Sequence, residues 1–461
     1  MLRLGVRTGV LPGPGRVVVV MNGIMGATEA AVRGTEPAPG PLQRLFSRDI
    51  FRDGAVVFAG SIVLGACGFL FHAIASRRLG VDAYGALYAI ISASIIACIP
   101  AAVVQPVLVR FAAEFRALHD DGHMAGLSRS VALGVVVVCF AYVAIGTLFA
   151  FPIAGFLRVP VWAIPLMGVV SAFVIASGAL RAIVQGTQDF TGLSISNALE
   201  GVGKVAGVFA LSALGLKLSG GLLGFMIGPA IAVAYVLFIL YRRYGSAQPQ
   251  SIRYDWPRIF AVIGGSAVGM ATVGVIGYAD VVLVKHFFAP SQAGLYSAAS
   301  LGGKMLFFLV GFIPTVLLPQ AAHRHARGET SLAPLFASLA GIGAISACGL
   351  VAFHFFSLQI LRALVGPAFD AAATLLVPYG LAMALLSLVN ALVTYGLATH
   401  RLSFAAPLLL CTIGTVAAVA AIHPTLYAVI AVMIAGTAAM AIVTALALLW
   451  DSRRAPVVKA V

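Results

Sequence analysis

Apolar residues form long, almost uninterrupted runs along most of the chain, and only short polar segments separate them. Twelve runs reach the roughly 20 residues that an α-helix needs to cross a bilayer. They lie at about residues 53–76, 84–108, 130–151, 161–183, 192–214, 219–241, 258–284, 294–318, 332–356, 371–396, 403–422 and 425–449. Membrane barrels instead use strands of about ten residues with alternating polarity. The pattern therefore predicts an all-α integral membrane protein with about twelve transmembrane helices.

Composition excludes the soluble alternatives. Of the 461 residues, 61% are hydrophobic and 10% are charged, whereas soluble domains carry about 25% charged residues. The 50 glycines allow helices to approach closely inside a bilayer. The five cysteines are far apart and lie within apolar runs, which predicts neither a disulfide framework nor a zinc site.

The charge of +14 predicts the orientation of the chain. An even number of spans places both termini on one side. The basic residues on that side would be Arg44, Arg48, Arg52, Arg110, Arg116, Arg129, Arg242, Arg243, Arg253, Arg258, Arg324, Arg327, Arg401, Arg453, Arg454 and Lys459. The other side would hold only Arg77, Arg78, Arg158, Lys217, Lys285 and Arg362. The positive-inside rule then predicts cytoplasmic termini, with attraction to anionic membrane lipid rather than to nucleic acid.

Two halves of the chain resemble each other. The segment SRRLGVDAYGALYAIIS from Ser76 aligns with VKHFFAPSQAGLYSAAS from Val284, so that Gly85 coincides with Gly294. We therefore predict two six-helix lobes, 48–245 and 246–452, related by a pseudo-twofold axis along the membrane normal. Residues 1–47 are expected to be a cytoplasmic tail, disordered or upstream of the true start, and 453–461 a second cytoplasmic tail.

Prolines recur in register in the two halves, at Pro100 and Pro106 and again at Pro314 and Pro319. Proline removes a backbone donor and bends a helix. Interrupted helices at matching positions in two repeats indicate a translocation pathway. These four prolines are therefore predicted to mark hinges or bent helices.

Ionisable residues inside predicted spans are costly and indicate function. Glu200 and Lys204 are four residues apart, a spacing that favours an ion pair. Lys304 has no acidic neighbour within four residues, so we expect it to face a wet cavity or to lie near Glu200 or Asp280. Asp280 is expected to neutralise Lys304, with the coupling of a proton or cation as the alternative.

Arg77 and Arg78 lie at the end of the first span, where basic residues are otherwise few. Because guanidinium groups bind phosphate in a bidentate manner, both are candidates for an anionic substrate pathway, with interfacial snorkelling as the alternative. The full predicted pathway is Arg77, Arg78, Lys204, Lys304, Gln105 and Asn197. Gln105, Asn197 and Arg181 have contacts between helices as their alternative role, and His72 is assigned to packing.

Several of these segments together resemble a known family. They are Ser76–Tyr88, LRAIVQGTQDF at Leu180–Phe190, the Glu200/Lys204 pair, and Ala293–Lys304 with Pro314 and Pro319. Over about residues 44–450 the chain resembles Wzx-type polysaccharide-biosynthesis flippases of the multidrug/oligosaccharidyl-lipid/polysaccharide exporter superfamily, which includes the MATE drug antiporters.

The resemblance implies a MATE-like fold in the bacterial inner membrane, working as a monomer by alternating access. The implied substrate is an undecaprenyl-pyrophosphate-linked oligosaccharide destined for O-antigen of lipopolysaccharide, capsule or exopolysaccharide. A polysaccharide polymerase and glycosyltransferases are the implied protein partners.

No cofactor, metal site or enzymatic activity is predicted, because the chain has no catalytic loop and no nucleotide-binding glycine-rich motif. Two other functions stay open. One is a cation-coupled, MATE-like multidrug exporter that uses Asp280, although its cationic drugs would favour an acidic cavity. The other is a non-transporting scaffold in a polysaccharide-synthesis complex.

Overall fold

The computed structural model describes residues 48–252, 256–326, 332–399 and 401–454, and these residues form helices without any strand. The predicted tail at 1–47 lies outside the described residues, as do residues 455–461. The helices are α2 (Arg48–Leu79), α3 (Val81–Ala102), α4 (Gln105–Ala117), α5 (Asp121–Leu148), α6 (Ala150–Leu157), α7 (Ala163–Gly186), α8 (Phe190–Ala213), α9 (Leu218–Tyr244), α10 (Trp256–Phe287), α11 (Pro290–Leu309), α12 (Phe312–Ala326), α13 (Leu332–Leu364), the 3₁₀ helix η1 (Pro367–Ala372), α14 (Ala373–Ala398), α15 (Ala405–Ala421) and α16 (Leu426–Arg454).

Among the described residues, ten helical segments are long and apolar enough to cross a membrane. Each of the twelve predicted spans falls on a helix or on two consecutive helices. The two predicted spans missing from the ten lie on α8 and α15. Polar residues, Glu200 and Lys204 among them, lower the hydropathy of α8, and α15 is an apolar helix of only 17 residues. The prediction of an all-α multi-pass fold is confirmed.

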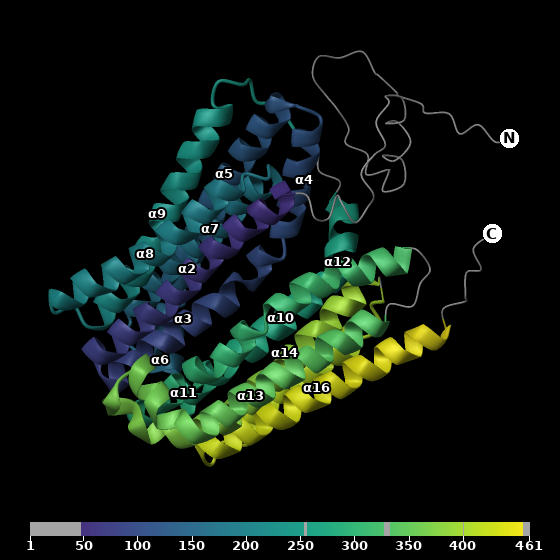
Figure 1. Ribbon diagram of the computed structural model, residues 1–461. Coiled ribbons are helices and arrows are strands. Elements are labelled where there is room, and N and C mark those ends of the chain that lie inside the picture. Colours follow the sequence, from purple (N-terminus) through teal and green to yellow (C-terminus); the bar gives the residue numbers. More distant parts are fainter. Residues whose placement is uncertain (1–47, 253–255, 327–331, 400, 455–461) are drawn as a thin grey trace.

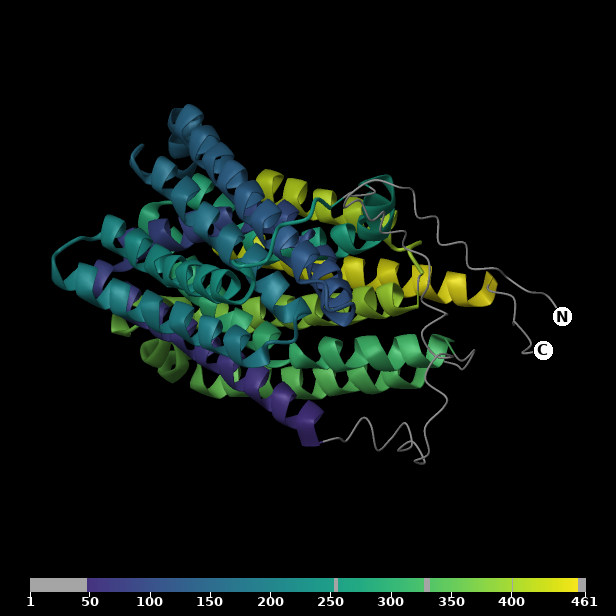
Figure 2. The same ribbon diagram turned by 90° about the horizontal axis from the view of Figure 1, so that it is seen from above.

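The helices gather in two bundles, α2–α9 and α10–α16, which meet at one end and diverge toward the other (Figure 1). In the first bundle α8 packs between α2 and α9, and in the second α14 packs against α11, α13 and α16. Helix α3 contacts α10 and α11 and so joins the bundles. The start of α2 and the end of α16 lie at the same end of the molecule (Figure 2). We call the end where the bundles meet the closed end and the other the open end.

The predicted bends are present in both halves. Helix α3 ends at Ala102 and α4 begins at Gln105, with Pro106 in its first turn. In the second half α11 ends at Leu309 and α12 begins at Phe312, just before Pro314. Proline has no backbone N–H for the helical hydrogen bond, so each helix is interrupted close to its prolines. The role of these interruptions as hinges stays a prediction.

The two bundles touch through the glycines that the sequence repeat aligns. A Cβ atom added to Gly85 would lie 2.7 Å from the backbone nitrogen of Gly294 and 2.8 Å from its Cα. A Cβ added to Gly294 would in turn overlap the backbone carbonyl of Val81. The crossing of α3 and α11 at the closed end therefore depends on the absence of side chains at both repeated positions.

Helix α5 begins with a side-chain cap at the open end. The Asp120 carboxylate accepts the backbone N–H of His123 at 2.9 Å, and Nδ1 of the buried His123 ring lies 2.6 Å from Oδ2. The backbone N–H of His123 holds the pKa of Asp120 below its usual value. The inter-bundle linker then packs on this helix, with the Gln250 N–H donating to the carbonyl of Gly122. The cap thus orders the surface on which the linker lies.

Gly85→Leu should lower the melting temperature of the purified protein, because the added side chain overlaps the backbone of α11. Overpacking of this kind costs about 1–3 kcal/mol. The matched control is Gly134→Leu in α5, where an added Cβ meets nothing within 4 Å. Equal melting temperatures for the two variants would show that the glycine contact does not matter to stability.

Asp120→Ala should destabilise the protein by about 1 kcal/mol at neutral pH, through loss of the helix cap. Because the folded-state pKa of Asp120 is lowered, the cap's charge-dependent contribution is present above its unfolded pKa of about 3.9 and is lost as the pH falls through the folded value. The difference in stability between wild type and Asp120→Ala should therefore shrink between neutral pH and about pH 3.

Asp120→Asn serves as the control, since asparagine caps a helix as well as aspartate does. Melting curves at the two pH values provide the measurement. A difference between wild type and Asp120→Ala that does not change with pH would contradict an ionised cap.

Candidate functional site

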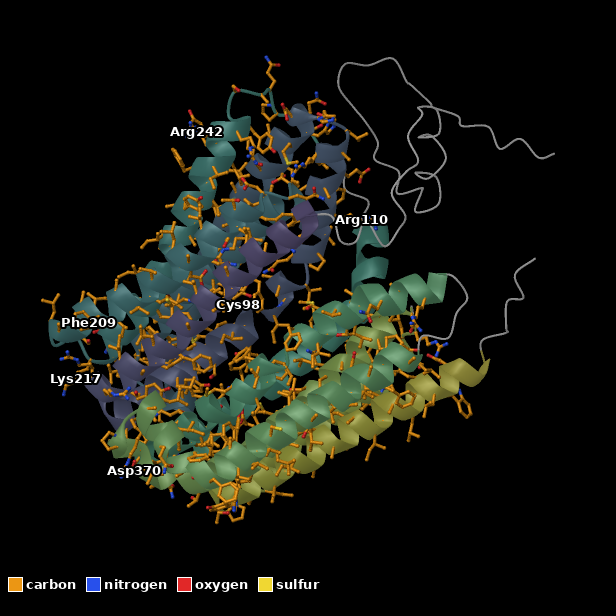
Figure 3. All side chains as sticks on the ribbon, viewed as in Figure 1. Cys98, Arg110, Phe209, Lys217, Arg242 and Asp370 are labelled. Carbon is orange, nitrogen blue, oxygen red and sulfur yellow. The ribbon has the colours of Figure 1, made fainter. Side chains whose placement is uncertain are left out.

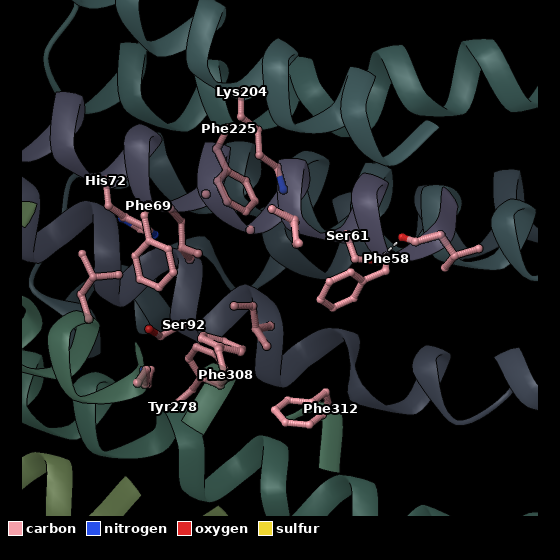
Figure 4. Close-up of a pocket in the computed structure, with 18 of the residues that line it drawn as sticks. Phe58, Ser61, Phe69, His72, Ser92, Lys204, Phe225, Tyr278, Phe308 and Phe312 are labelled. Atoms are coloured by element: carbon pink, nitrogen blue, oxygen red, sulfur yellow. Dashed lines mark hydrogen bonds between the residues drawn. The ribbon is translucent and has the colours of Figure 1, made fainter. Parts of the chain in front are cut away.

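A cavity of about 1190 Å³ lies between the two bundles (Figure 4). Its walls come from α2, α3, the α7–α8 turn, α8 and α9 on one side and from α10, α11 and α12 on the other. The lining residues are Val57, Phe58, Ser61, Ile62, Gly65, Gly68, Phe69, His72, Tyr88, Ile91, Ser92, Ile95, Gln188, Phe190, Lys204, Phe225, Tyr278, Leu301, Lys304, Phe308, Phe312 and Thr315. This set contains two lysines and no carboxylate. The described residues hold no group of three or more His, Cys, Asp and Glu side chains suited to a metal ion.

Lys304 is buried on the second bundle's side of the cavity. Its Nζ donates to the Tyr88 hydroxyl at 3.2 Å and lies 4.0 Å from the centre of the Tyr278 ring. An aromatic face stabilises a cation without neutralising it, and an ammonium has three donor hydrogens. Within the described residues Tyr88 is the one hydrogen-bond acceptor of Lys304, so donor capacity is left for an anion in the cavity. Lys304 therefore lines the cavity and also lies close enough to Asp280 for the two charges to interact, which covers two of the three predicted surroundings.

Lys204 faces the cavity from α8 on the first bundle's side. Its Nζ donates to Oε1 of Glu200 at 2.6 Å and lies 4.4 Å from the centre of the Phe225 ring. The predicted pair is therefore formed. Glu200 has a second partner in Arg181 of α7, whose guanidinium lies 2.5 Å from Oε2 and also donates to the hydroxyl and carbonyl oxygens of Ser196. Two cations share one carboxylate, and only Lys204 of the three lines the cavity.

Asp280 and Lys304 interact electrostatically, as predicted, but they form no direct ion pair among the described residues. Asp280 is 1% exposed, and its Oδ2 accepts hydrogen bonds from the hydroxyls of Tyr296 at 2.8 Å and Tyr379 at 2.7 Å. Its other oxygen, Oδ1, is buried and has no hydrogen-bond partner in the described part of the chain. The Lys304 charge and two tyrosine hydroxyls together stabilise this carboxylate, and the hydroxyls hold it within the second bundle rather than at the cavity surface.

The cavity changes character along its length. The α2 residues in its wall run from Val57 to His72, which corresponds to about 22 Å of helix. Toward the open end the wall includes Phe58, Phe312 and Ile62, each more than half exposed. The deeper part contains the two lysines and His72, whose Nδ1 lies 3.4 Å from the Tyr84 hydroxyl. An apolar mouth therefore leads to a cationic floor.

Arg77 lies outside the cavity and connects the two bundles at the closed end. Its guanidinium donates to the carbonyls of Arg362 at 2.9 Å, Ala363 at 2.8 Å and Leu364 at 3.3 Å. These carbonyls end α13 and have no partner within that helix. The fork of donors on one arginine thus caps a helix of the opposite bundle, and the predicted contact of Arg77 with substrate stays a prediction.

The other predicted pathway residues also lie away from the cavity wall. Arg78 is exposed and sits over the Phe209 ring at 5.9 Å. Gln105 packs against Gly178 of α7, as in its alternative role between helices. Asn197 lies half-buried on α8 outside the lining. Of the predicted set, Lys204 and Lys304 are brought together at the cavity.

Sequence reasoning assigned His72 to packing and missed the other polar side chains of the wall, which are Ser61, Tyr88, Ser92, Gln188, Tyr278 and Thr315. A signal for both His72 and Tyr88 does exist, because Tyr88 lies within the first aligned repeat segment and His72 lies four residues before it. Tyr278 precedes Asp280 by two residues, so a search for aromatic residues near the buried charges would have found it.

Comparison with known proteins identifies the fold. No protein-family model matches the chain, and no curated protein sequence matches it. Among solved structures, the chain is similar to an inward-facing multidrug resistance MATE family transporter of the MOP superfamily, with a TM-score of 0.71, 10% identity and coverage of 84% of this chain and 93% of that one. It is also similar to an outward-facing MATE transporter, with a TM-score of 0.61, 11% identity and coverage of 88% and 96%.

A lipid flippase shares the fold as well. The lipid II flippase MurJ in an inward closed conformation gives a TM-score of 0.57 at 14% identity, over 86% of this chain and 88% of that one. At these identities the comparisons define the architecture. The chain thus has the all-helical fold of these MATE and MurJ structures.

Arg77→Lys should loosen the closed end, because an ammonium lacks the planar fork that reaches three carbonyls. We expect the population in which α2 and α13 are separated to rise roughly fivefold, which corresponds to a free-energy change of about 1 kcal/mol. Spin labels on the two helices would report the distribution of distances between α2 and α13 by double electron–electron resonance. Arg78→Lys is the matched control, and equal effects of the two variants would contradict a specific role for Arg77.

Proposed function

We propose that the protein transports an amphipathic anion, a lipid-linked oligosaccharide joined through a diphosphate, across the membrane. The observation that carries this proposal is the cavity between the bundles, whose wall presents Lys204 and Lys304 and no carboxylate. The two carboxylates close to these lysines do not line the cavity: Glu200 is shared by Lys204 and Arg181, and Asp280 accepts hydrogen bonds from two tyrosines. The cavity surface is therefore positive, which suits a diphosphate.

The change from an apolar to a cationic wall along the cavity supports a lipid-linked substrate. A polyprenyl chain suits the apolar mouth beside Phe58 and Phe312, while the diphosphate suits the cationic floor. The cavity volume of about 1190 Å³ exceeds the roughly 300–1,000 Å³ of a small-molecule pocket. Serine, threonine, glutamine and tyrosine side chains in the wall supply hydrogen-bonding groups for sugars. An undecaprenyl-pyrophosphate-linked repeat unit for surface polysaccharide fits this combination.

The basic residues at the two ends support a sidedness of transport. Arg110 and Arg242 lie at the open end, whereas Lys217 and Asp370 lie at the closed end (Figure 3). By the positive-inside rule the open end is cytoplasmic, so both ends of the chain are cytoplasmic and the cavity faces inward. The higher TM-score against the inward-facing MATE structure supports this assignment. The protein would then accept its substrate from the cytoplasmic leaflet of a bacterial inner membrane.

In this mechanism the substrate competes with Glu200 for Lys204. When the diphosphate takes Lys204, Glu200 keeps its ion pair with Arg181, so no carboxylate is left buried without a partner. This lowers the cost of the exchange, since a buried charge without a partner is strongly destabilising. Alternating access then requires the contacts of Arg77 and of Gly85 at the closed end to separate while the open end closes.

A cation-coupled multidrug exporter is the second candidate, and the similarity to a multidrug resistance MATE transporter favours it. A cationic drug would meet two lysines and no carboxylate on the cavity wall, which argues against it. A coupling role for Asp280, with a proton or cation on its unpartnered Oδ1, is compatible with either candidate and stays a prediction. Polymerase and glycosyltransferase partners also stay predictions.

Lys304→Met should reduce transport at least about tenfold, and Lys204→Met should do the same, because each removes a charge-assisted hydrogen bond to the diphosphate worth about 1.5–3 kcal/mol. Each variant is expressed in its host after deletion of the gene. The assay measures surface polysaccharide and the lipid-linked oligosaccharide that remains on the cytoplasmic side. Lys217→Met, an exposed lysine at the closed end, is the control.

The proposal requires the surface pool to fall and the cytoplasmic pool to rise in both lysine variants, at unchanged membrane abundance. Two pools that do not change even on deletion of the gene would refute it. Resistance to cationic drugs on expression of the wild type, lost in Asp280→Asn, would then support the multidrug exporter.

A further inference from the structure

A second cavity, of about 350 Å³, lies at the open end of the first bundle. It forms where the end of α4, the α7–α8 turn and the end of α9 come together. Its lining residues are Arg116, Thr187, Gln188, Asp189, Arg243 and Tyr244. Every one of these six side chains has a polar group, in contrast to the mostly apolar wall of the central cavity.

The lining of this second cavity keeps a positive surplus. Arg243 pairs with Asp189 at 3.2 Å, and Asp189 also accepts the backbone N–H of Gly192 at 2.9 Å as the cap of α8. Arg116 is exposed, and no ion pair satisfies it within the described residues. Within the lining, two guanidinium groups therefore face one carboxylate, which is already shared between a cation and a helix terminus, while Asp121 outside the lining acts on Tyr244. An adjoining cavity uses Asp189 and Arg243 again and adds Arg242.

Gln188 connects the second cavity with the central one, because it lines both. Its backbone is left-handed, with φ of 55°. A non-glycine residue in this region is strained, and such strain persists where the surrounding structure requires it. The residue lies within the Leu180–Phe190 segment, which also supplies Arg181 to the ion-pair network of the central cavity. One short segment thus takes part in both sites.

We propose that the second cavity is an entry site for a phosphate-bearing headgroup, which passes Gln188 on its way to Lys204. The inference rests on the proposed function and adds a binding site to it. Arginine binds phosphate oxygens in a bidentate manner, and basic pockets on the cytoplasmic side of membrane helices suit anionic headgroups. The headgroup chemistry is shared by the substrate's diphosphate and by an anionic lipid of the bilayer.

The site is tested by isothermal titration calorimetry, in which inorganic pyrophosphate is added to the purified full-length protein in a neutral detergent. We expect wild type to bind pyrophosphate at two places. The double variant Arg116→Gln/Arg243→Gln should lose one of them, with affinity there at least about tenfold lower. Arg110→Gln is the control, because Arg110 is an exposed arginine of the same helix α4 that lines neither cavity. Unchanged binding in the double variant, or equal loss in Arg110→Gln, overturns the proposal.

The double variant Lys204→Met/Lys304→Met separates this inference from the proposed function. It should lose the central site and keep the entry site. If it binds pyrophosphate as wild type does while the arginine variant loses a site, the central cavity is not the anion site but the entry site stands. Repeating the titration with phosphatidylglycerol in the micelles identifies which molecule supplies the phosphate-bearing headgroup. Competition at the entry site indicates a bilayer lipid, and its absence indicates the diphosphate of the substrate.

Discussion

An ionised group inside a bilayer needs a partner or water, and this requirement organises the whole interior of the protein. Glu200 is held by two cations and Asp280 by two tyrosine hydroxyls, and both carboxylates are thereby kept within their bundles. Lys304 is supported by aromatic rings, which leave its charge intact, and Lys204 adds the Phe225 ring to its pair with Glu200. The result is a cavity whose surface is positive although the protein buries acids and bases together.

The same requirement explains how the bundles are joined at the closed end. No acid of the second bundle pairs with Arg77 in the described structure; backbone carbonyls at the end of α13 take its donors. The Arg362 carbonyl also accepts the backbone N–H of Gly366, and Arg77 supplies the donors for the carbonyls of Ala363 and Leu364 at the end of the helix. Contacts of this kind depend on geometry more than on net charge, which suits an interface that has to break and form again.

Sequence predicted the parts of this structure that depend on local spacing. The spans follow from the length of apolar runs, the Glu200–Lys204 pair from a separation of four residues, and the helix breaks from proline. The contact of Gly85 with Gly294 was visible only as an aligned repeat, and the structure shows it as a physical crossing. Contacts between distant helices could not be found in this way, because they depend on which faces meet. Arg77 reaches carbonyls more than 280 residues away, and the two tyrosines of Asp280 come from two different helices.

The crossing of α3 and α11 also determines how far the open end moves when the bundles rotate against each other. Gly85 lies near the closed end, and the path along α3 and α4 to Ala117 covers 32 residues, or about 48 Å if it were straight. A rotation of about 10° around the crossing would move the far end of this path by roughly 8 Å, while the backbones at the glycines would hardly shift. Small changes where the bundles touch would therefore become large changes in the width of the opening.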